Sequence, residues 1–382
     1  VPGITSAIAA AAYGGIPVTH RDYSSSLHII TGHVRKGAAL DIDFGALARL
    51  GGTLVFLMGV AAMPAITAGL LEAGMAPDTP AAMVENGTLP TQRRCAATLG
   101  TLCRQAAEME LQSPAVLVVG GVCALAAELC WFERLPLHGK RILVTRPVDR
   151  AGTLSEKLRV LGADVVEFPC IRTEAVSPCP AIEAALERLP EYEWLGFTSA
   201  AGVEAFWTCL RGMGKDARAL SGVKLAAIGP ATGRALEAHG VTADLVPELC
   251  DAPHMGEALA KAAAGRVLLL RAEEGSPALT DALAAAGAAF DDIAVYRTIY
   301  DNPHSAELRE ELEAGGFDFV TFTSASTVKG FVSAVGKDAD FSRFTGLCIG
   351  KQTAGEAEKH HISAKTAGQA AIDALVELAL ER

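Results

Sequence analysis

The chain has 382 residues, of which 50% are hydrophobic and 20% charged, so it can form two or three packed domains and is not disordered. Its formal net charge of −11 excludes general nucleic-acid binding. Nine cysteines without a CxxC pair exclude a disulfide framework and a zinc site, and indicate reduced thiols in a cytoplasmic protein. Glycines interrupt the apolar stretches 53–75 and 114–132, so we expect no membrane span.

Residues 1–135 alternate short apolar runs with helical patterns, which predicts an α/β domain. The predicted strands are Leu27 to Thr31, Thr53 to Met58, Ala81 to Val84 and Ala115 to Val119. The predicted helices are Ile4 to Tyr13, Phe44 to Leu50, Met63 to Ala73 and Gln92 to Met109.

Four residues of this first module have properties that suit ligand binding. Thr5 and Ser6 offer hydroxyls and free N–H groups at the start of a helix. Met58 ends a buried strand with a flexible thioether, and Gly87 allows a ligand to approach the backbone closely. Alternatively, the two hydroxyls only cap a helix and the thioether only fills the core.

The order and spacing of several segments closely resemble the C-terminal half of uroporphyrinogen-III C-methyltransferase. These segments are VPGITSA from Val1, GIPVTHRDY ending at Tyr23, ITGH ending at His33, TLVFLMG from Thr53, VENGT ending at Thr88 and SPAVLVVG from Ser113. The resemblance implies that residues 1–135 bind S-adenosylmethionine through Thr5, Ser6, Met58 and Gly87, act on uroporphyrinogen III to give precorrin-2, and form a homodimer. That family also has a glycine-rich N-terminal domain, which is not found here. We therefore expect a truncated module without methyltransferase activity. Alternatively, the module is only a scaffold or dimerisation unit.

A short connection, Trp131 to His138, leads into a second module that contains an internal repeat. The repeat consists of three pairs of segments in the same order, each pair about 120 to 125 residues apart. The pairs are RILVTRP from Arg141 with RVLLLRA from Arg266, WLGFTSAAGVEAF from Trp194 with FVTFTSASTVKGF from Phe319, and LAAIGPATGRALEAHG from Leu225 with LCIGKQTAGEAEKHH from Leu347.

Each repeated block is an apolar strand, a turn and an amphipathic helix, which predicts parallel sheets with helices on both faces. We expect two flavodoxin-like domains with a cleft between them, and ligands bound beyond the carboxyl ends of the strands. Small polar residues follow those predicted strands, at Thr198, Ser199, Thr232, Thr323, Ser324, Ser326 and Thr353. They either cap the following helices or bind an anionic ligand there.

The blocks of the second module look like uroporphyrinogen-III synthase across Gly139 to Arg382. The resemblance implies that this module closes the linear tetrapyrrole hydroxymethylbilane into a macrocycle, with inversion of ring D and loss of water. It also implies two subdomains, one formed by 139–170 plus 298–382 and the other by 173–296. The chain would cross between them at 166–173 and 293–299.

The same resemblance implies roles for individual residues. Tyr296, in the segment VYRT, matches the tyrosine proposed as the general acid, and the small polar residues above match positions that bind the substrate. Arg146 is a further candidate partner for a substrate carboxylate. Neither a cofactor nor a metal is expected for this module. An alternative reading is a non-catalytic two-domain protein that binds a small molecule, of the periplasmic type, with the first module as its scaffold.

Overall fold

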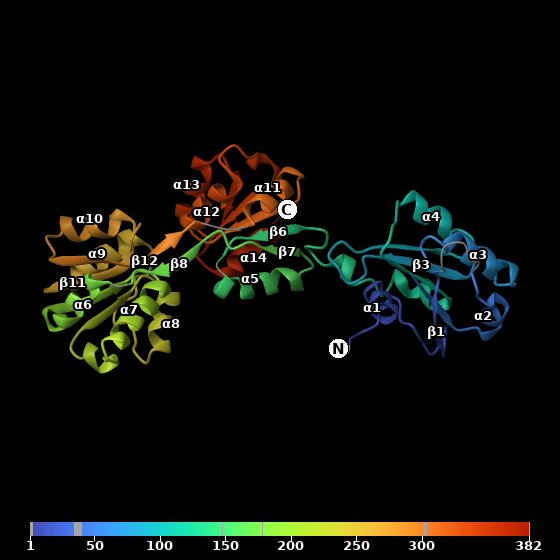
Figure 1. Cartoon of the computed structure of the whole chain (residues 1–382), viewed down its shortest axis with the longest axis horizontal. Coiled ribbons are helices and arrows are strands. Elements are labelled where there is room, and N and C mark those ends of the chain that lie inside the picture. The colour runs from blue at the N-terminus through green and yellow to red at the C-terminus, as the bar shows by residue number, and fades with distance from the viewer. Residues whose placement is uncertain (1–2, 34–39, 147, 178, 301–303, 382) are drawn as a thin grey trace.

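The structure, a computed structural model, describes residues 3–33, 40–146, 148–177, 179–300 and 304–381. It contains three five-stranded sheets, each in its own α/β unit (Figure 1). Buried side chains form a separate core on each face of each sheet, so every unit has three layers. No helix among the described residues combines the length and apolarity that a membrane span requires.

The first sheet has the strand order β1–β2–β5–β3–β4, and only β1 and β2 run parallel. Its strands are β1 (Leu27–Thr31), β2 (Thr53–Leu57), β3 (Pro80–Glu85), β4 (Arg93–Thr98) and β5 (Ala115–Val119). One face is covered by α2 (Phe44–Leu50), α3 (Met63–Glu72) and α4 (Leu102–Glu108), and the other by α1 (Ser6–Tyr13) and the 3-10 helix η1 (Gly121–Ala126). Along β2, Phe56 points into the core under α2, α3 and α4, and Val55 points into the core under α1 and η1. Both side chains are fully buried.

The predicted helix from Gln92 to Met109 is wrong, because its first half forms β4. Strand β4 pairs antiparallel with β3, and only the turn after Leu99 leads into the helix α4. In that turn, a Cβ on Gly100 would lie 3.2 Å from the backbone oxygen of Pro77, so the two chain segments approach closely. The pairing with β3 therefore overrides the helical propensity of this alanine-containing run.

The second module has two sheets whose strands are almost all parallel. One has the order β10–β9–β11–β12–β8, in which only β8 runs antiparallel to its neighbour. Its strands are β8 (Arg172–Ala175), β9 (Tyr192–Phe197), β10 (Lys224–Ala227), β11 (Arg266–Ala272) and β12 (Phe290–Ile299). Its helices are α6 (Pro180–Glu187), α7 (Ala200–Gly212), α8 (Pro230–Ala238), α9 (Ala252–Ala262) and α10 (Pro277–Ala285), with the 3-10 turns η3 (Leu189–Glu191) and η4 (Ala217–Leu220).

The other sheet has the order β15–β14–β13–β6–β7, and all its strand pairs are parallel. Its strands are β6 (Arg141–Val144), β7 (Asp164–Glu167), β13 (Phe319–Phe322), β14 (Thr345–Cys348) and β15 (Ala364–Thr366). Its helices are α5 (Val148–Val160), α11 (Ser305–Glu313), α12 (Ala325–Val335), α13 (Lys351–Lys359) and α14 (Ile372–Leu380), with the 3-10 turn η5 (Phe341–Arg343). The parallel sheets with helices on both faces confirm the fold class predicted from the repeat.

The repeat in the sequence does not coincide with one sheet. Strands β6 and β7 begin the first repeat, yet β6 pairs with β13 of the second repeat, and β7 pairs with β6 at the edge of the same sheet. Likewise β11 and β12 begin the second repeat but extend the sheet of β9 and β10. Each repeat therefore gives its first two strands to one sheet and its later strands to the other.

The connection between the modules is anchored at both ends. Phe132, in the 3-10 turn η2 (Phe132–Arg134), and Trp131 pack against Tyr13 of α1, each with ring centroids 4.9 Å apart. At the other end, Leu137 is buried in the core beside α5, and its N–H donates to the carbonyl of Leu161 at 2.9 Å. Only a few residues separate these anchors, so the connection is short and ordered.

Candidate functional site

Two serine-capped turns follow the corresponding strands β9 and β13, one at the carboxyl edge of each parallel sheet. Ser199 caps α7 and accepts a hydrogen bond from the N–H of Gly202 at 3.0 Å. Ser324 caps α12, accepts from the N–H of Thr327 at 3.2 Å, and donates its own N–H to that threonine hydroxyl at 3.2 Å. This reciprocal arrangement is a capping box, and it fixes the start of α12.

Thr232 and Thr353 are not helix caps, contrary to the prediction. The cap positions of α8 and α13 are occupied by Gly229 and Gly350, and both threonines lie in the first turn of their helix. Their side chains face inward, with the residues only 3% and 4% exposed. Neither glycine provides a side chain to cap the helix, so at these two turns only the backbone N–H groups of the first turn could bind an anion.

Tyr296 of β12 lies beside the turn that caps α7. Its hydroxyl is 2.9 Å from the Ser199 hydroxyl, which acts as the donor. The Tyr296 ring is half-buried and packs against the core beneath α7. Because Ser199 donates to the phenol oxygen, the phenol proton of Tyr296 stays available for another acceptor.

Among the described residues, the hydroxyl of Tyr296 forms its hydrogen bond with Ser199 and forms none with the twin turn at Ser324. Ser324 instead hydrogen-bonds Ser326, with their hydroxyl oxygens 3.0 Å apart. Thr198 and Thr323 directly precede the two serine caps, and both are half-buried. The structure therefore groups the predicted residues into two sets, and Tyr296 belongs with Ser199.

Arg146 lies at the same sheet edge as the Ser324 turn. Strands β6 and β13 are parallel, with Val144 beside Thr321. Arg146 follows Val144 by two residues and is half-buried. Its position beside a serine-capped helix start suits an anionic group, because the cation and the helix N–H groups act on the same side.

In the first module, two of the four residues predicted to contact a cofactor, Met58 and Gly87, lie at one edge of the first sheet, and Gly87 packs beside Ala10 of α1. The ends of β2 and β3 lie beside the start of β5, so Met58 and Gly87 follow their strands at the same edge. Thr5 caps α1, accepting weakly from the N–H of Ala7 at 3.4 Å, and both Thr5 and Ser6 are exposed.

Packing explains Gly87 better than ligand approach does. A Cβ at Gly87 would lie 2.5 Å from the Cβ of Ala10, so only glycine lets the β3 loop pack on α1. Met58, in contrast, is 62% exposed and has a positive φ of 55°. Such a backbone is uncommon for a residue with a side chain and occurs often at functional sites.

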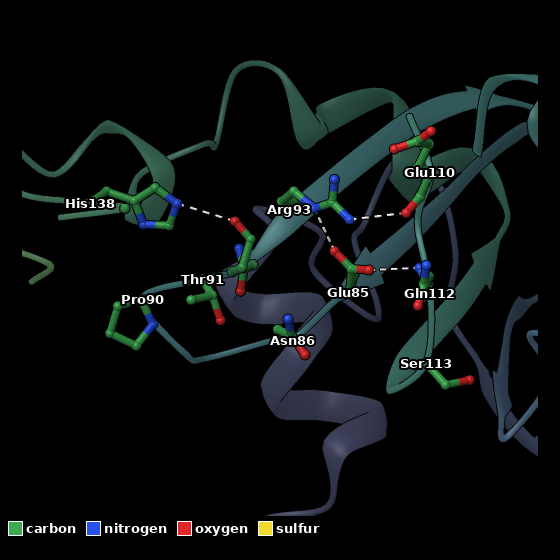
Figure 2. A pocket seen from close by; sticks show the side chains of 11 residues that line it. Glu85, Asn86, Pro90, Thr91, Arg93, Glu110, Gln112, Ser113 and His138 are labelled. Atoms are coloured by element: carbon green, nitrogen blue, oxygen red, sulfur yellow. Dashed lines mark hydrogen bonds and ion pairs between the residues drawn. The ribbon is translucent and has the colours of Figure 1, made fainter. Parts of the chain in front are cut away.

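A cavity of about 630 Å³ lies where the β3–β4 hairpin meets the connection (Figure 2). Arg93 crosses it, donating to the Glu85 carboxylate at 2.5 Å and to the carbonyl of Glu110 at 3.1 Å. Burial alone would raise the pKa of Glu85, but the hydrogen bonds from Arg93 and from the N–H of Gln112 lower it overall. His138 reaches into the hairpin, with Nε2 3.1 Å from the carbonyl of Gln92. Glu85 and Arg93 are paired with each other and with backbone groups, so this side of the cavity is a structural junction.

Sequence reasoning missed two ion pairs that organise this chain. One is the Glu85–Arg93 pair, which crosses the β3–β4 hairpin. The other joins Arg271 of β11 to Asp292 of β12, and Arg271 is only 9% exposed. In the sequence, the only sign of these ion pairs was opposite charge on two strands. The pairs can be predicted from it only when the pairing of those strands is known.

Comparisons with known proteins agree with both modules. Residues 152–377 match the family model described as uroporphyrinogen-III synthase HemD, and residues 1–103 match that of tetrapyrrole (corrin/porphyrin) methylases. The porphyrin biosynthesis protein HemD of Ruminiclostridium josui is 43% identical over the whole chain, which spans 76% of that relative. The uroporphyrinogen-III C-methyltransferase of Bacillus subtilis (strain 168) is 37% identical over 63% of this chain, which spans 49% of that relative.

Solved structures are similar to each module separately. A mutant uroporphyrinogen III synthase of the extremely thermophilic bacterium Thermus thermophilus is 21% identical and covers 62% of this chain and 96% of its own, with a TM-score of 0.48. The uroporphyrin-III C-methyl transferase of Thermus thermophilus, complexed with S-adenyl homocysteine, is 32% identical and covers 33% of this chain and 53% of its own, with a TM-score of 0.28. The matches to the family model and to the R. josui relative show that this chain belongs to the uroporphyrinogen-III synthase HemD family, and it joins that domain to a tetrapyrrole methylase domain.

Proposed function

We propose that the second module is a uroporphyrinogen-III synthase that closes hydroxymethylbilane into uroporphyrinogen III, inverting ring D and releasing water. The observation that carries this proposal is the hydrogen bond between Tyr296 and Ser199 at the start of α7. It holds a phenol at the carboxyl edge of a parallel sheet, where ligands of such folds bind. By resemblance, the chain position of this tyrosine also matches that of the tyrosine proposed as the general acid in the family.

In the proposed mechanism, the phenol of Tyr296 donates its proton to the hydroxymethyl group as the C–O bond breaks and water leaves. Ser199 donates to the phenol oxygen and thereby stabilises the phenolate that forms. The helix N–H groups after Ser199, Gly229, Ser324 and Gly350 bind substrate carboxylates, with Arg146 beside the third of these turns. Thr198, Thr323 and Ser326 contribute to the same turns. Holding both ends of the linear substrate brings the reacting carbons together, so proximity supplies much of the rate.

A non-catalytic binding protein is the alternative, and the same turns would serve it. The phenol favours the enzyme, because carboxylate binding by helix N-termini needs no proton donor. The test is to incubate the protein with hydroxymethylbilane and to separate the products by chromatography. We expect the type III isomer in excess of the type I isomer that forms without an enzyme. Type I alone, from folded protein, would refute the assignment.

For the first module, we propose that residues 1–135 belong to an S-adenosylmethionine-dependent methyltransferase that forms precorrin-2. The residues present suit one wall of a cofactor site, because Met58 is exposed after the end of β2 and Thr5 and Ser6 are exposed at the start of α1. S-adenosylmethionine would supply the methyl group, and the thioether of Met58 would contact its adenine face.

We further propose that the synthase has its subdomain boundaries at 139–170 plus 298–382 and 173–296, supported by the division of the strands between the two sheets. A homodimer formed through the first module is supported by its exposed apolar side chains, such as Ile4 and Ile8. A cytoplasmic location is supported by the nine free cysteines.

A further inference from the structure

One hydrogen bond joins the two sheets of the synthase module through side chains. The hydroxyl of Tyr300 donates to the Glu274 carboxylate at 3.1 Å. Tyr300 directly follows β12 and packs against the core of the β13 sheet. Glu274 lies in the loop between β11 and α10, which belongs to the other sheet. The bond therefore spans the point where the chain crosses from one sheet to the other.

Hydrogen bonds from the Arg271 side chain hold the loop that carries Glu274 in place. We call residues 272–276 the hinge loop. The Arg271 guanidinium donates to Asp292 through Nε at 2.6 Å and to the carbonyl of Ser276 at 2.7 Å. A Cβ at Gly275 would lie 2.4 Å from Nη1 of Arg271, so glycine is needed for the loop to close over the guanidinium. Because the arginine is buried and paired on both sides, the hinge loop has little freedom to move.

The hinge loop also holds the backbone of the proposed general acid. The N–H of Glu273 donates to the carbonyl of Tyr296 at 2.9 Å. The pairing of β11 with β12 shifts by one residue here, so that Ala272 lies beside Tyr296. Such a bulge redirects the side chains that follow it. One loop thus positions Tyr296 through its backbone and Tyr300 through the side chain of Glu274.

We propose that Tyr300 is a positioning residue of the synthase, whose hydrogen bond to Glu274 holds the β13 sheet in the orientation that brings its binding turns to Tyr296. Tyr300 also lies near Glu356 of α13, the helix whose first turn at Gly350 is one of those binding turns. Glu356 is itself paired with Lys359 at 2.9 Å. Burial and the bond to Glu274 raise the pKa of Tyr300 to about 12, so it remains a donor at neutral pH. The kinetic part of this inference rests on the proposed function.

The test compares Tyr300→Phe with Tyr192→Phe in the full chain. Tyr192 also hydrogen-bonds a carboxylate, that of Asp291, but both lie within one sheet. Tyr300→Phe keeps the ring packing and removes only the bond between the sheets. We expect hydrogen exchange, followed by mass spectrometry, to speed up at least about threefold in peptides covering 168–176 and 295–300, because local opening becomes more frequent. Tyr192→Phe leaves these peptides unchanged.

In kinetics, we expect Tyr300→Phe to raise KM for hydroxymethylbilane about three- to tenfold while kcat changes less than about twofold, because a smaller fraction of the enzyme is in the binding-competent orientation. Glu274→Ala should reproduce both effects, and the double variant should add little to either single one. Glu273→Ala is the matched control, since it removes an adjacent exposed carboxylate but keeps the N–H that holds Tyr296.

The outcomes separate this inference from the proposed function. If the unmodified chain forms no type III isomer, the proposed function fails, while the exchange comparison still decides whether Tyr300 ties the sheets together. If exchange in Tyr300→Phe equals that of the Tyr192→Phe control, the inference is overturned. A fall in kcat at unchanged KM would also overturn it, because Tyr300 would then act on the chemical step.

Discussion

Replacing Tyr296 by phenylalanine tests the proposed chemistry most directly. The ring keeps its packing against the core beneath α7, so only the hydroxyl and its 2.9 Å bond to Ser199 are lost. The Ser199 hydroxyl is half-buried and can bond water instead, which limits the loss in the free energy of unfolding to about 1 kcal/mol. We expect the rate of type III isomer formation to fall roughly ten- to a thousandfold, which corresponds to about 1.4 to 4 kcal/mol of transition-state stabilisation.

The assay is initial-rate formation of type III isomer at saturating hydroxymethylbilane, with thermal unfolding of each variant as the check on folding. Ser199→Gly and Ser199→Ala provide the controls, because both remove the donor to Tyr296, whereas glycine largely preserves helix capping and alanine does not. Equal rate losses in these two variants would assign the effect to the lost hydroxyl, and a larger loss in alanine would assign it to the helix start. A wild-type rate in Tyr296→Phe would refute the general-acid role.

Two further predictions concern the first module. Gly87→Ala should lower the free energy of unfolding of the first module by about 1 to 3 kcal/mol, because the new Cβ clashes with Ala10. Adding Ala10→Gly should relieve that clash, at a loss of about 1 kcal/mol of helix propensity. As a control, Gly355→Ala should be neutral or stabilising, because no atom lies within 4 Å of its Cβ. Because the pKa of Glu85 is lowered from 4.5, its contribution is full above that pH and declines as the pH falls through the lower folded-state value. Glu85→Gln should therefore destabilise at pH 7 by roughly 1 to 2 kcal/mol and by less near pH 3, as measured by unfolding, while exposed Glu108→Gln should change little at either pH.

Local patterns predicted most elements of the fold. The run from Thr53 is apolar on both faces, and the structure buries it between two cores as β2. The sequence did not predict strand β4, because Arg93, Arg94 and the alanines that follow them favour a helix in isolation. Its strand conformation depends on β3, and on the deep placement of Arg94, whose guanidinium reaches the carbonyl of Gly14 at 2.6 Å. Neither contact is visible in a local window.

The candidate site was predictable in its residue types and less so in its geometry. Serines after apolar strands became caps at Ser199 and Ser324, as the pattern indicated. Thr232 and Thr353 did not, because a preceding glycine takes the cap position and the threonine turns inward. Contacts such as that of Tyr296 with Ser199 join residues 97 positions apart, and only the sheet order brings them together.

The exchange of strands between the repeats explains why the crossing segments matter for function. If each repeat folded alone, the crossing would be a dispensable linker. Instead β6 and β7 complete the sheet of β13, while β11 and β12 complete the sheet of β9, so the chain must cross twice. Both crossings lie beside β8 and the end of β12, which pair antiparallel from Tyr296 to Ile299. The general acid proposed for the synthase and the hydrogen bond between the sheets are thus built on the same short ladder, and a change in the orientation of the sheets must also act on Tyr296.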